Sequence, residues 1–171
     1  NVSVIIKGLN ALRIVVDGNA SISSSFNLNG KTGQSGIYSG MGGPGGWNAG
    51  RLLNNSDFSN VPLNTLSGMG PGGGKGFDNL LSGGAGGSYG GLGSPGTSSG
   101  ILGIIYGDDN QTHLVGGSGG GRPGGLKVDA GGGGGAISFV IGGTFTLDEN
   151  ASISADGGSG GFFDNYGGGG G

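Results

Sequence analysis

The sequence predicts an all-β protein of the polyglycine-II type: a bundle of glycine-rich extended helices combined with short β-strands, solenoid-like and without α-helix. Three observations predict this class. Glycine supplies 51 of the 171 residues, the glycine tracts carry a side chain at every third position, and a strand pattern occurs twice. Each ordered glycine costs about 0.5–1 kcal/mol more than alanine through lost backbone freedom. A chain that orders this much glycine therefore needs dense backbone hydrogen bonding, close packing or assembly.

The composition favours an ordered chain over a disordered one. Disorder usually accompanies low hydrophobicity and high net charge, whereas here the formal net charge is −3 and 32% of the residues are hydrophobic. The apolar residues are also concentrated in runs such as 2–6 and 137–141. A flexible Gly/Ser linker is the alternative. It explains the glycine content but not the regular spacing of side chains within the tracts.

A unit of short strands is present twice. Residues 14–23 (IVVDGNASIS) recur as residues 145–154 (FTLDENASIS), and the upstream residues 2–8 match 137–143. β-Branched residues and period-two alternation favour strands over helix. Each copy thus predicts three strands, with a turn at the Asp-x-Asn before the third. The copies lie near the two ends of the chain, which fits one module ending and the next beginning.

The glycine tracts between these units have a three-residue period. In residues 40–47 the side chains are Met41, Pro44 and Trp47. Polyproline-II geometry has three residues per turn, so this pattern places all side chains on one edge and leaves two edges bare. Bare edges let neighbouring backbones approach closely. Collagen is excluded because it needs one glycine in three over long runs with much proline, and the chain has five prolines.

These patterns divide a single glycine-rich domain, residues 1–171, into four parts. They are a strand unit at 1–29, a polyglycine-II region at 30–135, the second strand unit at 136–156 and a glycine-rich end at 157–171. The chain starts at Asn1 rather than methionine, which suggests a processed product or part of a longer protein.

Two resemblances follow from these segments. Residues 106–121, and residues 131–141 with 151–158, resemble recurrent motifs of large glycine-rich bacterial surface proteins. This resemblance implies export to the cell surface and a repetitive build rather than an activity. The glycine tracts preceded by a strand are also similar in architecture to the receptor-binding adhesins of T-even-type phage tail fibres. That second resemblance implies that loops such as 48–66 carry recognition.

No residue pattern predicts a catalytic, cofactor or metal site, and we expect a non-enzymatic protein. His113 is the only histidine and there is no cysteine. Residues 73–81 fit a calcium-binding nonapeptide, but the adjacent repeats that would supply further ligands are missing. Asp108, Asp109 and Asn110 have the oxygen ligands that calcium prefers, although a polar turn explains them better.

Two classes of partner are not expected. No stretch of 18 or more apolar residues is present, so the sequence predicts no membrane-spanning segment. Seven Lys and Arg residues without a basic run give no electrostatic footprint for nucleic acid.

Asparagine sequons are candidate glycosylation sites. Of the five Asn-x-Ser/Thr sequences, three have an aspartate two residues before the asparagine, the extended acceptor pattern of some bacterial systems. These three are Asn19, Asn110 and Asn150. The turn preference of Asp and Asn explains the same residues without a sugar.

The leading functional hypothesis is a structural subunit of an extracellular filament, sheath or surface layer, with itself as partner. Strand units at both ends leave unpaired edges that can template pairing with another copy. Head-to-tail contacts of this kind produce a filament unless the rotation closes a ring. The N-terminal segment 1–8, with Val2, Val4 and Ile6, is the predicted subunit-joining strand.

The main alternative is an adhesin module that binds a cell-surface receptor or glycan. Its contacts would come from aromatic residues in the glycine-rich region, since aromatic residues are frequent hot spots. These are Trp47, Tyr89, Phe162, Phe163 and Tyr166. They could equally pack onto glycine faces inside the bundle. Ice binding through a flat polyglycine face is a third class, but no regular threonine array favours it.

Overall fold

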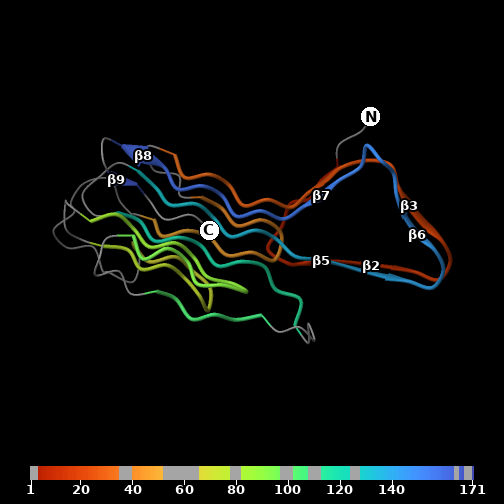
Figure 1. Ribbon diagram of the computed structural model, residues 1–171, viewed down its shortest axis with the longest axis horizontal. Helices are drawn as coiled ribbons and strands as arrows, with labels where there is room; N and C mark the ends of the chain where they lie inside the picture. The colour runs from red at the N-terminus through yellow and green to blue at the C-terminus, as the bar shows by residue number, and fades with distance from the viewer. Residues whose placement is uncertain are drawn as a thin grey trace.

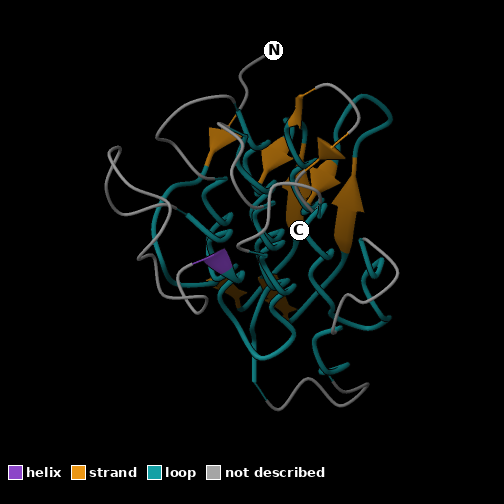
Figure 2. Ribbon diagram, turned by 90° about the vertical axis from the view of Figure 1, so that its left-hand side faces the viewer, coloured by secondary structure: helices purple, strands orange, loops and turns teal. Residues whose placement is uncertain are grey.

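The computed structural model describes residues 4–34, 40–51, 66–77, 82–96, 102–107, 113–123, 128–163, 166–167 and 171. Most of the short strands lie at one end of the molecule, the strands at 162–163 and 166–167 lie at the other end, and glycine-rich segments run side by side between them (Figure 1). Among the described residues only Leu66 is helical (Figure 2), and the all-β class is confirmed. Within this described part no helix has the length and apolar character needed to cross a membrane.

The strands are short, and the described residues contain nine of them. In β2 half-buried and exposed residues alternate, as in Leu12-Arg13-Ile14, and turns that contain glycine follow β2 and β5. They are β1 (Val4–Ile5), β2 (Leu12–Val16), β3 (Ala20–Ile22), β4 (Phe26–Asn27), β5 (Ile137–Ile141), β6 (Phe145–Leu147), β7 (Ile153–Ser154), β8 (Phe162–Phe163) and β9 (Tyr166–Gly167).

Strands β1–β3, the first strand unit, and β5–β7, the second strand unit, confirm the three strands predicted for each copy. They form three small parallel sheets, in which β2 pairs with β5, β3 with β6, and β4 lies between β1 and β7. The chain passes through all three sheets before it returns to the first, so the strands enclose a common interior (Figure 1). We call this arrangement the strand stack.

The two units pair directly with each other, but not in the register of the sequence repeat. β2 and β3 pair with β5 and β6, whereas the repeat matches them with β6 and β7. The repeat matches Ile14 with Phe145, whereas in the sheet Ile14 pairs with Phe139. The offset arises because β4, which the repeat does not predict, occupies the place beneath β7. The two copies, although they lie near the two ends of the chain, are therefore paired side by side in one strand stack.

The interior of the strand stack is aromatic. The ring of Phe139 contacts Phe26 edge-on, with a centroid distance of 6.2 Å, and Phe145 at 5.3 Å. Ile22 is 8% exposed beside them, and Leu28 is fully buried where β4 leads into the glycine-rich region. This small core holds the three sheets together.

Hydrogen bonding changes its period where the strand stack meets the glycine-rich region. The backbone amides of Phe26, Leu28, Gly30 and Gly33 bond successively to the carbonyls of residues 152, 154, 156 and 159, each at 2.8 Å. The two-residue step of a parallel strand thus becomes a three-residue step after Gly30. The same pair of chain segments continues without interruption from the sheet into the glycine-rich segments that run side by side, which we call the bundle.

Residues 113–123 and 128–136 run through the middle of this bundle. Gly117 and Gly120 donate to the carbonyls of Gly134 and Gly131, a three-residue step between antiparallel segments. Segment 116–122 also bonds to residues 45–50, 66–69, 74–77 and 85. Most of residues 116–123 and 128–136 are buried. The bundle interior therefore consists mainly of backbone rather than of large side chains.

Close approach of backbones is what requires glycine there. A Cβ atom on Gly133 would lie 1.9 Å from the carbonyl oxygen of Gly117, and one on Gly119 would lie 2.1 Å from that of Asn48. Both neighbours are backbone atoms, so no side-chain rotation relieves the overlap.

Candidate functional site

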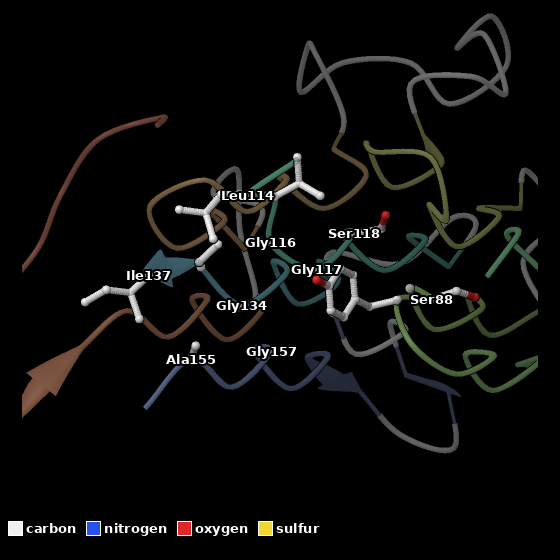
Figure 3. Close-up of a pocket in the computed structure, with 15 residues that line it drawn as sticks. Ser88, Leu114, Gly116, Gly117, Ser118, Gly134, Ile137, Ala155 and Gly157 are labelled. Atoms are coloured by element: carbon white, nitrogen blue, oxygen red, sulfur yellow. The ribbon is translucent and has the colours of Figure 1, made fainter. Parts of the chain in front are cut away.

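A cavity of about 370 Å³ lies between the bundle and the strand stack (Figure 3). Backbone of several glycine segments forms much of its wall, with Tyr89, Leu114, Val115 and Ile137 as the larger side chains. Its described lining holds no acidic or basic side chain. The described residues also contain no group of three His, Cys, Asp or Glu side chains that could hold a metal ion.

A chain of hydroxyl groups lies beside this cavity. The amide of Gly72 donates to Ser118 Oγ (3.0 Å), which donates to Tyr106 Oη (2.8 Å), which donates to the carbonyl of Gly116 (2.7 Å). The Tyr106 ring packs edge-on against Tyr89, with centroids 5.1 Å apart. Desolvation raises the pKa of Tyr106. These bonds tie the segments at 72, 106 and 116–118 together.

Tyr106→Phe should lower the free energy of unfolding by about 1–2 kcal/mol, because it removes a part-buried hydroxyl and leaves its partners with one bond fewer. Tyr89→Phe is the matched control, since Tyr89 is 38% exposed. Denaturant titration measures both. An equal effect of the two substitutions would contradict the structural role of the hydroxyl chain.

The raised pKa of Tyr106 also predicts the alkaline behaviour. The fold favours the neutral phenol, so its contribution is complete below the ordinary pKa of 10.0 and is lost as the pH rises through the higher folded-state pKa. Tyr106→Phe should therefore lose less stability than wild type above pH 10. Thermal unfolding as a function of pH measures the difference.

A buried ion pair joins the two central segments. Arg122 Nε donates to Asp129 Oδ1 at 2.8 Å, and both side chains are 2% exposed. Burial raises the pKa of Asp129, and the hydrogen bond from Arg122 opposes this shift. The pair is inaccessible to a substrate, so its position indicates a structural role. The only sequence signal for it is a charged residue interrupting the glycine tract at 116–125.

The second strand unit leaves an open end on the strand stack. Phe145 and Leu147 of β6 share a sheet face with Ala20 and Ile22 of β3, and that face lines the interior. Ile22 is 8% exposed, whereas Phe145 and Leu147 are 41% and 44% exposed. In the described part of the chain no strand lies on the outer edge of β5, β6 or β7. Core-facing apolar side chains are thus left uncovered.

The predicted subunit-joining strand forms the opposite end of the stack. Val4 lies in β1 and pairs with Phe26 of the same chain, and Ile6 is half-buried after it. Val2 lies outside the described residues. β1 is therefore an edge strand that already has one partner, and its remaining edge is the one that could accept another.

Two of the predicted aromatic contacts, Trp47 and Tyr89, are half-exposed. Trp47 and Tyr89 are 40% and 38% exposed. A Cβ on Gly70 would lie 2.7 Å from the Trp47 ring, and one on Gly107 would lie 2.9 Å from the Tyr89 ring, so each ring packs on a glycine. Phe162, Phe163 and Tyr166 lie in the β8–β9 hairpin.

Two of the candidate glycosylation sites, Asn19 and Asn150, lie at turns of the strand stack. Asn19 is exposed, and its Oδ1 accepts a hydrogen bond from the Thr144 amide at 2.8 Å. Asn150 is exposed in the turn between β6 and β7. Asn110 lies outside the described residues, as do Asp108, Asp109 and the last four residues of the nonapeptide at 73–81. His113 is exposed.

No known protein family, curated protein or solved structure matches the chain. The function is therefore inferred from its geometry, in which the open strand stack is the feature best suited to an interaction.

Proposed function

We propose that the protein is a structural subunit that self-associates into an extracellular filament, sheath or surface layer. The observation that carries this proposal is the open end of the strand stack, where Phe145 and Leu147 face the interior and remain 41% and 44% exposed. An extracellular or cell-surface location agrees with the resemblance to glycine-rich bacterial surface proteins.

The energetics of the open end favour association. Full burial of a Leu or Phe side chain contributes about 1.5–3 kcal/mol, so covering both side chains contributes about 1–3 kcal/mol per copy. The uncovered edges of β5, β6 and β7 add unpaired backbone groups, which a further strand would satisfy. A second copy supplies both the apolar cover and the strand edges.

The glycine-rich region suits a structural role. Its segments bond to their neighbours at every third residue, as expected for three-residue helices of the polyglycine-II type. Together with the strands that stack at its end, this supports a solenoid-like framework stiffened by backbone hydrogen bonds. The packing of Trp47 and Tyr89 on glycines likewise supports structural use of these rings over receptor or glycan binding.

The test compares wild type with the double variant Phe145→Asp/Leu147→Asp by electron microscopy and sedimentation velocity. Wild type should form regular assemblies whose size increases with concentration. The double variant should remain monomeric, because two carboxylates at the open end cannot be buried without a large desolvation penalty.

The matched control is Leu92→Asp/Ile104→Asp. These two side chains are 58% and 65% exposed and lie in the glycine-rich region, so this variant should assemble like wild type. Thermal unfolding of dilute samples checks that both variants fold. The proposal is overturned if wild type stays monomeric, or if the variant at the open end assembles as well as the control.

A further inference from the structure

We propose that copies associate head to tail, with the first strand unit of one copy placed on the second strand unit of another, each strand on its sequence equivalent. In this arrangement β1 lies on β5, β2 on β6 and β3 on β7. The inference rests on the proposed function and names the partner, a second copy in parallel orientation, and the register of its strands.

The two units expose opposite ends of the strand stack. Residues 12–28 form one layer and residues 136–154 form the next, joined by bonds such as Leu12 to Ala136 and Phe26 to Ser152. β1 pairs with β4 on the side away from β7. The unpaired edges at one end therefore belong to β1, β2 and β3, and those at the other end to β5, β6 and β7.

The order of the strands fixes which edges meet. β7 is the third strand of its sheet, so it occupies the position that β1 would need if a second copy were simply translated along the stack. The chain visits the three sheets in a fixed order, and the sheet that comes after the one containing β7 is the sheet that ends in β5. The next free position is therefore the outer edge of β5. A second copy that begins there places its β1 on β5, and its β2 and β3 then fall on β6 and β7.

The backbone groups match in this register. Ala20 bonds to the carbonyl of Thr144, and Asp148 bonds to the carbonyl of Ile22. Because alternate residues of a parallel pair point to the same neighbour, Phe145 and Leu147 direct their amides and carbonyls away from β3. In the same way Arg13 and Val15 of β2 point away from β5. Pairing Ile14 of one copy with Phe145 of the other brings these two sets of outward-pointing amides and carbonyls within bonding reach of each other.

The side chains match as well. Ile14 and Val16, which are half-buried inward residues of β2, would cover Phe145 and Leu147. Continuing the same register sets Asn19 on Asn150 and Ile22 on Ile153. Identical residues stacked in register occur in fibrous assemblies, asparagine ladders included. The sequence repeat that is not used for pairing within one chain is thus the pairing register between chains.

One contact opposes association. Asp17 would lie on Asp148, and like charges directly opposite each other are destabilising. Salt screens such an exposed pair, so assembly should strengthen as ionic strength increases.

Cross-linking tests the register directly, because the chain contains no cysteine. Val15 and Thr146 are both exposed and face outward. Val15→Cys and Thr146→Cys variants are mixed under assembly conditions and treated with a short bismaleimide. The mixture should give covalent dimers, while each variant alone should give none. Ser21→Cys mixed with Ser152→Cys is a second pair expected to link.

The matched control is Val15→Cys mixed with Val140→Cys. These positions pair within one chain, so a chain carrying both cysteines should link internally. On separate copies they should not link. Assembly with links between Val15→Cys and Val140→Cys, or with no links at the proposed pairs, would overturn this register and leave the proposed function intact. Absence of any assembly would instead overturn the proposed function and this inference with it.

Discussion

Gly133→Ala should unfold much of the glycine bundle. The new Cβ would lie 1.9 Å from the carbonyl oxygen of Gly117, and both residues are in central segments held by backbone bonds. The amide of Gly133 bonds to the carbonyl of Trp47, and its carbonyl accepts a bond from Gly43. Moving one segment aside therefore weakens several bonds together. We expect a loss of about 3 kcal/mol or more, at or above the upper end of ordinary overpacking.

Gly91→Ala is the matched control for this substitution. Nothing lies within 4 Å of a Cβ at Gly91, and its φ is not in the left-handed region. Alanine there should be neutral or stabilise the fold by about 0.4–1 kcal/mol, because it restricts the unfolded chain. Denaturant unfolding of both variants measures the contrast. Equal stability of the two would mean that backbone contact does not limit the bundle.

Arg122→Met should lower the free energy of unfolding by about 3–5 kcal/mol, since it leaves the Asp129 carboxylate buried without its cation. Replacing both residues, as Arg122→Met/Asp129→Leu, should restore most of this loss, because an apolar pair needs no compensation in the interior. Thermal or denaturant unfolding at neutral pH compares the single variant, the double variant and wild type. A single variant as stable as the double one would exclude an energetic coupling between the two side chains.

The same pair predicts the direction of pH dependence. Burial raises the pKa of Asp129 above its ordinary value of 3.8, so its contribution is complete below that value and is lost as the pH rises through the folded-state pKa. In Arg122→Met nothing opposes this shift. The variant should therefore lose stability more steeply than wild type as the pH rises from acid, which unfolding measured across the acid range tests.

The sequence predicted the elements that local patterns determine. Alternation of apolar and polar residues located β2 and β5, and the Asp-x-Asn turns located the ends of β2 and β6. These signals come from side chains a few residues apart, so they need no knowledge of the tertiary structure.

The parts that sequence reasoning missed depend on residues distant along the chain. β4 is two residues long and forms because β1 and β7 lie on either side of it. Arg122 and Asp129 face each other only once two central segments are side by side. The open end could not be predicted from the sequence either, because the exposure of Phe145 and Leu147 depends on which strands pair with β6. The N-terminal segment was predicted to join subunits, and its pairing with β4 shows that only one edge of β1 is left for that purpose.

The distribution of seven strands over three sheets sets the symmetry of any chain of copies built on this stack. The seven strands of one copy fill the three sheets twice and add one further strand. Each copy therefore begins in the sheet after the one in which the previous copy began. The fourth copy then returns to the orientation of the first, after seven layers of strands. With layers about 4.8 Å apart, the axial repeat would be about 34 Å. The glycine bundles of successive copies would project from three sides in turn, as in a threefold screw arrangement.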